Sequence, residues 1–210
     1  AKARAYFKGM VDFGEVLLVP PLVNTSGNWM TAARSTLPRE YNLGLLWRLT
    51  GDERFAARAT QELLHVVANC SVVFGWDPSG LVLAEMVHAV GIGYDWLYHY
   101  LSPAQRQTIV AGITRLGFDE ALSRYPHAFW ANCTFNWGIV TNGGLAVGAL
   151  AFLDEPIAAA NASAVLSRAL VGISQPFHSF APHGAWHEGS MYWGYTSEYA
   201  LAATESVRGV

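Results

Sequence analysis

The chain has 210 residues, of which 52% are hydrophobic and 14% charged, so the composition predicts one folded domain with a sizeable core and excludes a disordered chain. The formal net charge is −3, and the lysines are Lys2 and Lys8 alone, which excludes a basic surface for nucleic acid. No apolar run is as long as a membrane span, and eight Trp and nine Tyr indicate a ligand surface lined with aromatic rings.

Helical periodicity dominates the whole chain, and alternating strand patterns are scarce. Residues 1–19 predict a short helix that ends at Pro20-Pro21, and residues 22–38 predict a loop because Asn, Ser, Thr and Gly are frequent there. Further helices are predicted at residues 39–49, 53–69, 81–100, 103–116, 119–124, 136–153 and 156–171, and from within the segment 182–199 to about Ser206.

Local signals strengthen two of these helices. Ser102, Pro103 and Gln105 form the pattern of a capping box with proline at the first helical position. Gly144 and Gly148, among alanines, indicate a helix that a neighbour approaches closely. Seven to nine helices in antiparallel hairpins predict an all-α fold, an incomplete (α/α) toroid that forms a single domain over residues 1–210. A four-helix bundle has too few helices, and no repeat supports a regular solenoid.

The segment 182–199 concentrates aromatic residues, two histidines, two glutamates and three glycines. At helical spacing, Glu188, Tyr192, Tyr195 and Tyr199 share one face. A core-filling helix normally carries aliphatic residues there, whereas this face suits a groove that stacks on sugar rings. A helix with half-buried tyrosines and satisfied hydroxyls explains the pattern equally well.

A second segment, 130–144, places three asparagines and two tryptophans at the start of an apolar helix. One interpretation is that Thr134 or Asn136 caps the helix and that the tryptophans pack. The other is that Asn136, backed by the helix N-terminus, presents its amide to an anionic group.

Together these segments resemble the helical toroid domain of heparinase II/III-like polysaccharide lyases, a group that includes alginate lyases and the related dermatan sulfate epimerases. Four segments carry the resemblance: LLWRLTGDERF at 45–55, GIGYDWLY at 91–98 followed by Leu101-Ser102, NWGIVTNGG at 136–144, and EGSMYW at 188–193. They occur in order and cover most of the chain from about residue 40, and 56 residues (192 − 136) separate Asn136 from Tyr192, similar to the family spacing.

The resemblance implies β-elimination at a uronic acid of an anionic polysaccharide. No cofactor is expected, and no metal site is predicted because no group of His, Cys, Asp and Glu has convincing metal-ligand spacing. Tyr192 then takes the C5 proton and protonates the leaving O4, while Asn136 neutralises the carboxylate on C5. The resemblance also implies a secreted or periplasmic location, and the composition predicts no nucleic-acid or membrane partner. Substrate contacts are expected from His187, Glu188, Trp137, Trp130, Asn132 and Tyr195.

The chain departs from the family at several points. Trp137 stands where several members carry histidine, and the last toroid helices and a later β-sheet domain are not in this sequence, which predicts a fragment. Two alternatives stay open: a glycoside hydrolase that uses Glu188 and Asp95 as its carboxylate pair, and a non-catalytic carbohydrate-binding toroid. Whether Cys70 and Cys133 pair is also open.

Overall fold

The computed structural model describes residues 2–69 and 80–209, and this part of the chain is all-helical, without strands. The α-helices are α1 (Lys2–Leu17), α2 (Trp29–Thr50), α3 (Glu53–Ala68), α4 (Leu81–Leu97), α5 (Pro103–Ile113), α6 (Asp119–Arg124), α7 (Asn136–Leu150), α8 (Ala159–Phe177) and α9 (Ser190–Arg208). A π-helical turn, Thr114–Phe118, joins α5 to α6, and short 3₁₀ turns cover Phe129–Ala131 and His178–Phe180.

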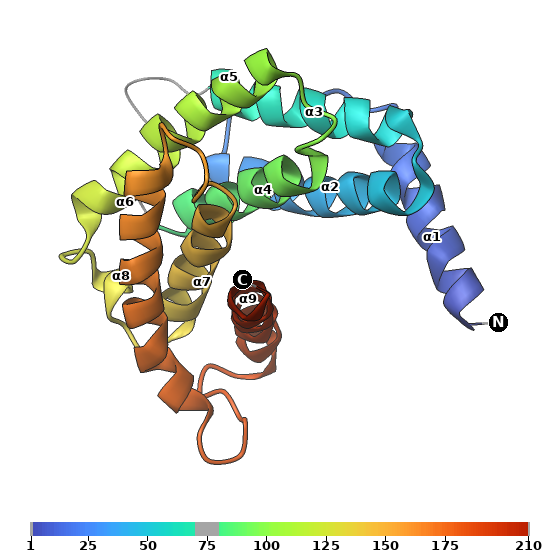
Figure 1. The fold of residues 1–210 in the computed structure, drawn as a ribbon. Coiled ribbons are helices and arrows are strands. Elements are labelled where there is room, and N and C mark those ends of the chain that lie inside the picture. Colours follow the sequence, from blue (N-terminus) through green and yellow to red (C-terminus); the bar gives the residue numbers. More distant parts are fainter. Residues whose placement is uncertain (1, 70–79, 210) are drawn as a thin grey trace.

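The helices form a curved arrangement in two rows (Figure 1). Helices α2, α4 and α7 lie along the inner side of the curve, and α3, α5, α6 and α8 lie along the outer side. Helix α9 packs on α7 at the inner side, while α7 also packs against α4 and α8, and α2 packs against α3 and α4. The inner side of the curve is therefore bordered by helices that are far apart in the sequence.

Small residues bring α4 and α7 together, as the sequence predicted for the glycines of α7. A Cβ atom added to Gly144 would lie 2.7 Å from the carbonyl oxygen of Ala84, and one added to Gly91 would lie 2.6 Å from the Cα atom of Gly148. Such distances are shorter than van der Waals contact, so the two backbones approach each other only because these positions carry no side chain.

The capping box at the start of α5 is confirmed. The Ser102 hydroxyl accepts a hydrogen bond from the Gln105 backbone N–H at 3.3 Å, and the Gln105 side chain accepts one from the Ser102 N–H at 2.9 Å. The predicted bounds of α6 also match the structure, and helices are present at the other predicted positions, with ends shifted by a few residues except at the start of α2. Local sequence was sufficient at these sites because the signals involve residues that are adjacent in the chain.

The expected loop over residues 22–38 is wrong beyond residue 28, because α2 begins at Trp29, ten residues earlier than predicted. The Asn28 side chain caps the helix by accepting from the backbone N–H groups of Met30 and Thr31 at 2.9 and 3.2 Å. The helix continues through Pro38, which has no N–H to donate to the carbonyl of Arg34. The polar residues of this segment, among them the capping asparagine, were thus interpreted as loop signals.

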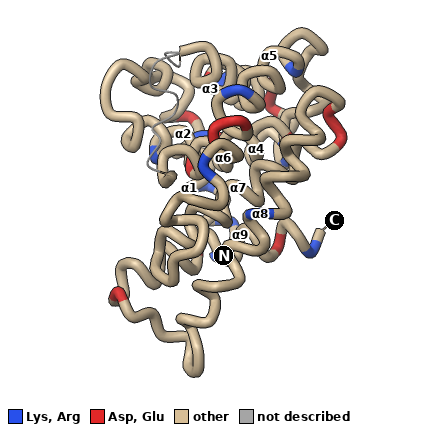
Figure 2. The backbone as a smooth tube through the Cα atoms, turned by 90° about the vertical axis from the view of Figure 1, so that its left-hand side faces the viewer, with Lys and Arg blue, Asp and Glu red and all other residues tan. Residues whose placement is uncertain are grey.

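The face predicted for the last helix also needs correction. Helix α9 begins at Ser190, so Glu188 precedes the helix and does not share its face with Tyr192, Tyr195 and Tyr199. Charged residues are sparse along the backbone (Figure 2). Within the described ranges, no helix has the length and apolarity needed to cross a membrane. Cys70 lies outside the described residues, so whether it pairs with Cys133 stays open.

Candidate functional site

A cavity of about 1020 Å³ opens between α1, α2, α4 and α9 on the inner side of the curve. Its walls are mainly aromatic and aliphatic, with rings contributed by Tyr6, Phe13, Tyr41, Tyr192, Tyr195 and Tyr199. Cavities of this size and composition, with a few convergent polar groups, are typical of small-molecule and oligosaccharide sites.

Three polar side chains from three helices meet in this cavity: Arg34 of α2, Glu85 of α4 and Tyr195 of α9. The Tyr195 hydroxyl donates to Glu85 Oε1 at 2.5 Å. Arg34 donates from Nε to both carboxylate oxygens and from Nη2 to Oε1, each at 3.3 Å, and from Nη2 to the Tyr195 hydroxyl oxygen at 3.4 Å. The Arg34 guanidinium carbon also lies 5.6 Å from the centroid of the Tyr195 ring.

Burial differs sharply within this cluster. The Glu85 side chain is 2% exposed, whereas the side chain of Arg34, which also lines the cavity, is 51% exposed. Burial raises the pKa of the Glu85 carboxyl, and the nearby Glu198 raises it further, although Tyr195 and Arg34 act in the opposite direction. Burial, followed by the adjacent Glu85 charge, also raises the pKa of Tyr195. The phenol therefore stays protonated, and its hydroxyl donates a hydrogen bond to Glu85.

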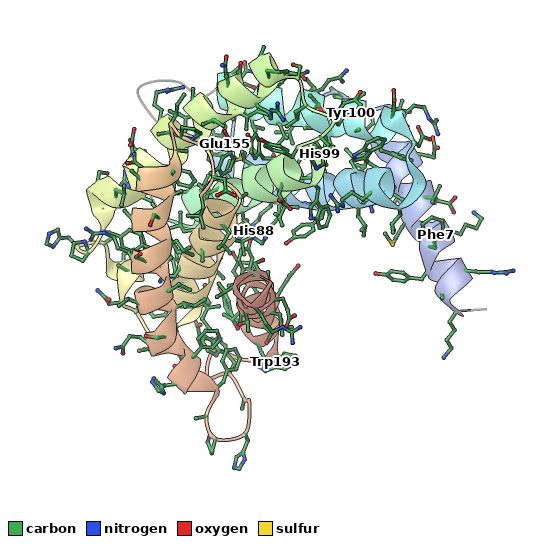
Figure 3. All side chains as sticks on the ribbon, in the orientation of Figure 1. Phe7, His88, His99, Tyr100, Glu155 and Trp193 are labelled. Carbon is green, nitrogen blue, oxygen red and sulfur yellow. The ribbon has the colours of Figure 1, made fainter. Side chains whose placement is uncertain are left out.

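His88 forms the inner wall of the cavity and lies between α4 and α9 (Figure 3). Its Nε2 atom is 2.7 Å from the Tyr41 hydroxyl, and its ring packs edge-on against Tyr199 at a centroid distance of 5.4 Å. Burial lowers the pKa of His88 to about 3, so the imidazole is neutral at physiological pH. Among the described residues that line the cavity, Arg34 is therefore the one permanent cation.

Tyr192, the predicted base and acid, lies in the first turns of α9, and its side chain lines the cavity with 37% of the residue exposed. The predicted contact residue Tyr195, one turn later on the same helix, also lines the cavity. Both phenols were singled out from the sequence pattern of 188–199. Their shared face is a consequence of helical spacing, which local sequence specifies.

Asn136, the predicted partner of the substrate carboxylate, does not line the cavity and is 4% exposed. Its Nδ2 group donates to Glu188 Oε1 at 2.8 Å, and its backbone N–H donates to Glu188 Oε2 at 2.6 Å. The indole N–H of Trp186 donates to the same oxygen at 2.9 Å. The amide of Asn136 is thus committed to a protein carboxylate and is not presented to the cavity in this arrangement.

The predicted cap at the start of α7 is wrong. Neither Thr134 nor Asn136 is the N-cap of α7; Phe135 occupies that position and provides no capping side chain. The carboxylate of Glu188 replaces the missing cap from 52 residues further along the chain, and it also complements the positive end of the α7 dipole. The hydrogen bonds of Glu188 therefore hold the segment before α9 against the start of α7.

The other predicted contact residues lie outside the cavity lining. Trp130 is 1% exposed and packs against Tyr125 at 4.8 Å between ring centroids, so its indole offers no face to a sugar. Trp137 is half-buried against Phe129. Asn132 and His187 are exposed on loops, with the His187 ring 5.1 Å from that of Trp186.

The carboxylate pair of the hydrolase alternative does not meet in the cavity either. Glu188 is bound to Asn136 and Trp186, and Asp95 is exposed on α4 outside the cavity lining. The carboxylates that line the cavity are Glu85 and Glu198. Over the part of the chain that the structure describes, no three His, Cys, Asp or Glu side chains are grouped so that they could hold a metal ion.

Sequence reasoning missed Arg34, Tyr41, Glu85, His88 and Glu198. A readable signal existed for two of them: Glu85 and His88 interrupt an otherwise apolar helix, LVLAEMVHAV, one turn apart. Buried ionisable groups in such a helix point to a specific polar site. Arg34 was overlooked because the start of α2 was interpreted as a loop.

A scan against known protein families finds no family that matches the sequence, and a search of curated proteins finds no match either.

Proposed function

We propose that the protein is a polysaccharide lyase that cleaves a uronic-acid-containing polysaccharide by β-elimination. The observation that carries the proposal is the position of Tyr192: the phenol belongs to the segment that resembles the catalytic segment of heparinase II/III-like lyases, and it lies on an aromatic cavity large enough for sugar rings. The two curved rows of helices are consistent with part of an (α/α) toroid, and the same resemblance supports a secreted or periplasmic location.

In the proposed reaction, the Tyr192 phenolate removes the proton from C5 of the uronic acid. The electron pair left on C5 forms the C4–C5 double bond as the C4–O4 bond breaks. The departing O4 then receives the proton from the Tyr192 hydroxyl, which regenerates the phenolate. One residue serves both steps when the proton and the leaving group lie on the same face of the sugar.

Tyr192→Phe tests this proposal. The change removes the hydroxyl but keeps the ring, so we expect loss of at least about 100-fold in elimination rate, the contribution of a positioned acid or base. The protein is incubated with alginate, glucuronan, heparan and chondroitin, and the conjugated double bond is followed by its ultraviolet absorbance. Thermal unfolding of the variant, expected to match the wild type because Tyr192 is partly exposed, serves as the control. Full activity in Tyr192→Phe would remove the phenol from the mechanism.

A glycoside hydrolase is the second candidate, since Glu85 and Glu198 both line the cavity and the pKa of Glu85 is raised, as a general acid requires. The products separate the two candidates. A hydrolase releases saturated reducing ends without ultraviolet absorbance, and a non-catalytic binding protein releases neither product.

A further inference from the structure

The guanidinium of Arg34 has the geometry of a preformed anion-binding group. Glu85 and Tyr195 hold its Nε and Nη2 groups from one side, and the Tyr195 ring lies 5.6 Å from its centre. Its Nη1 group makes no hydrogen bond to any described residue, half of the side chain is exposed, and the residue lines the cavity. The buried carboxylate thus fixes the orientation of a cation that retains free donors.

The other polar groups of the cavity cannot take this role. His88 is neutral, the tyrosines carry no positive charge, and Glu198 repels anions. Asn136 is committed to Glu188. A planar guanidinium with free N–H groups matches the two oxygens of a carboxylate, and its charge makes the contact strong.

We infer that Arg34 binds the carboxylate of the sugar ligand, so that the cavity selects carboxylated over neutral sugars. This assignment rests on the proposed function for the class of ligand, and it gives the task predicted for Asn136 to a residue from a different helix. Glu85 is then a positioning residue that holds Arg34 and does not touch the sugar. The aromatic walls stack on the sugar rings, and Glu198 accepts hydrogen bonds from sugar hydroxyls at a distance from the carboxylate.

Calorimetric titration with tetrasaccharides of glucuronan and alginate tests the inference, each compared with the same tetrasaccharide after reduction of its carboxylates to primary alcohols. The wild type should bind the acidic forms about 10- to 100-fold more tightly than the reduced forms, the range expected for hydrogen bonds to a charged group. Arg34→Gln should abolish this difference and leave the weak binding of the reduced forms unchanged. Arg34→Lys should retain part of it.

The controls address folding and general charge. Arg34→Gln leaves Glu85 buried without its cation, so the double variant Arg34→Gln/Glu85→Gln provides a version without a buried unpaired charge. Arg106→Gln removes another arginine that lies over a tyrosine ring, that of Tyr98 at 4.5 Å, but outside the cavity, and should bind like the wild type.

The outcomes distinguish this inference from the proposed function. Equal affinity of the wild type for acidic and reduced sugars, no binding of either, or unchanged selectivity in Arg34→Gln would each overturn it. Binding that depends on Arg34 without formation of a double bond would support the inference and contradict the lyase proposal. If Arg34→Gln carries out elimination with an unchanged KM, the result would support the lyase proposal and contradict the inference about Arg34.

Discussion

At the scale of single residues, Glu85 and the substrate carboxylate of the proposed complex compete for the positive charge of Arg34. An ionised Glu85 neutralises the cation that we propose for the substrate carboxylate, whereas a protonated Glu85 leaves its charge available. The titratable and charged groups that influence Glu85 or are influenced by it are Arg34 from α2 and Tyr195, Tyr199 and Glu198 from α9. Of these, Tyr195 and Tyr199 keep their protons from pH 5 to 8, because burial raises the pKa of both phenols.

A pH dependence of binding follows. Because burial raises the pKa of Glu85 above its ordinary value, Glu85 takes up a proton at a higher pH than an ordinary glutamate does as the pH falls. The affinity for glucuronan tetrasaccharide should therefore increase as the pH falls through the Glu85 pKa. Calorimetric titrations from pH 8 down to pH 4 measure this increase.

Glu85→Gln supplies the comparison. The amide imitates the protonated acid, so the variant should bind the tetrasaccharide at least as tightly as the wild type at pH 8 and show little change with pH. A variant that keeps the full pH dependence of the wild type would assign the titration to another group.

At the scale of elements, the start of α7 and the segment before α9 depend on one another. The carboxylate of Glu188 supplies the N-cap that α7 lacks and accepts three hydrogen bonds, from the backbone and side chain of Asn136 and from Trp186. Glu188 lies two residues before α9 and four before Tyr192. The contact therefore holds the helix that carries the proposed catalytic phenol.

Glu188→Ala should lower the free energy of unfolding by about 1.5–3 kcal/mol, the range for hydrogen bonds to a charged group. Asn136→Ala should cost less, because its backbone N–H still donates to Glu188. Urea denaturation of the two single variants and the double variant measures their coupling, which we expect to exceed about 0.5 kcal/mol. Glu205→Ala, which removes an exposed ion pair with Arg208, is the control and should change stability by less than about 1 kcal/mol. Strict additivity would contradict the shared cap.

At the scale of the whole molecule, the two rows of helices enclose a carboxyl group that has no hydrogen-bond partner among the described residues. Glu40 of α2 is fully buried beside Leu63 and Gly93, and neither of its oxygens is hydrogen-bonded to any described residue. Burial, followed by the charge of Glu62, raises the pKa of Glu40 well above its ordinary value, although Arg39 acts against the shift. The folded protein thus keeps Glu40 protonated over a pH range in which the unfolded chain has released the proton.

The sign of the effect on stability follows from this difference. Below the ordinary pKa of a glutamate both states are protonated, and Glu40 imposes no penalty for ionisation. As the pH rises toward the folded-state pKa, the unfolded chain ionises first, so the free energy of unfolding falls. Glu40→Gln should remove this decline, so that the variant gains stability relative to the wild type between pH 4 and pH 8.

Urea denaturation across this pH range tests the expectation, with Glu120→Gln on the exposed side of α6 as the control. A difference between Glu40→Gln and the wild type that stays constant with pH would show that Glu40 does not titrate between the two states.

The sequence by itself determined the all-helical class, the capping box of α5, the bounds of α6 and the shared face of Tyr192 and Tyr195, because these depend on residues within one or two turns of each other. Only the tertiary structure decided which polar groups meet. Arg34 and Glu85 are 51 residues apart, and Glu85 and Tyr195 are 110 apart, so their contact depends on how three helices pack. The same reason explains Asn136: its helix start was predicted, but the carboxylate that occupies its amide comes from a distant segment, and no local pattern specifies that distance in space.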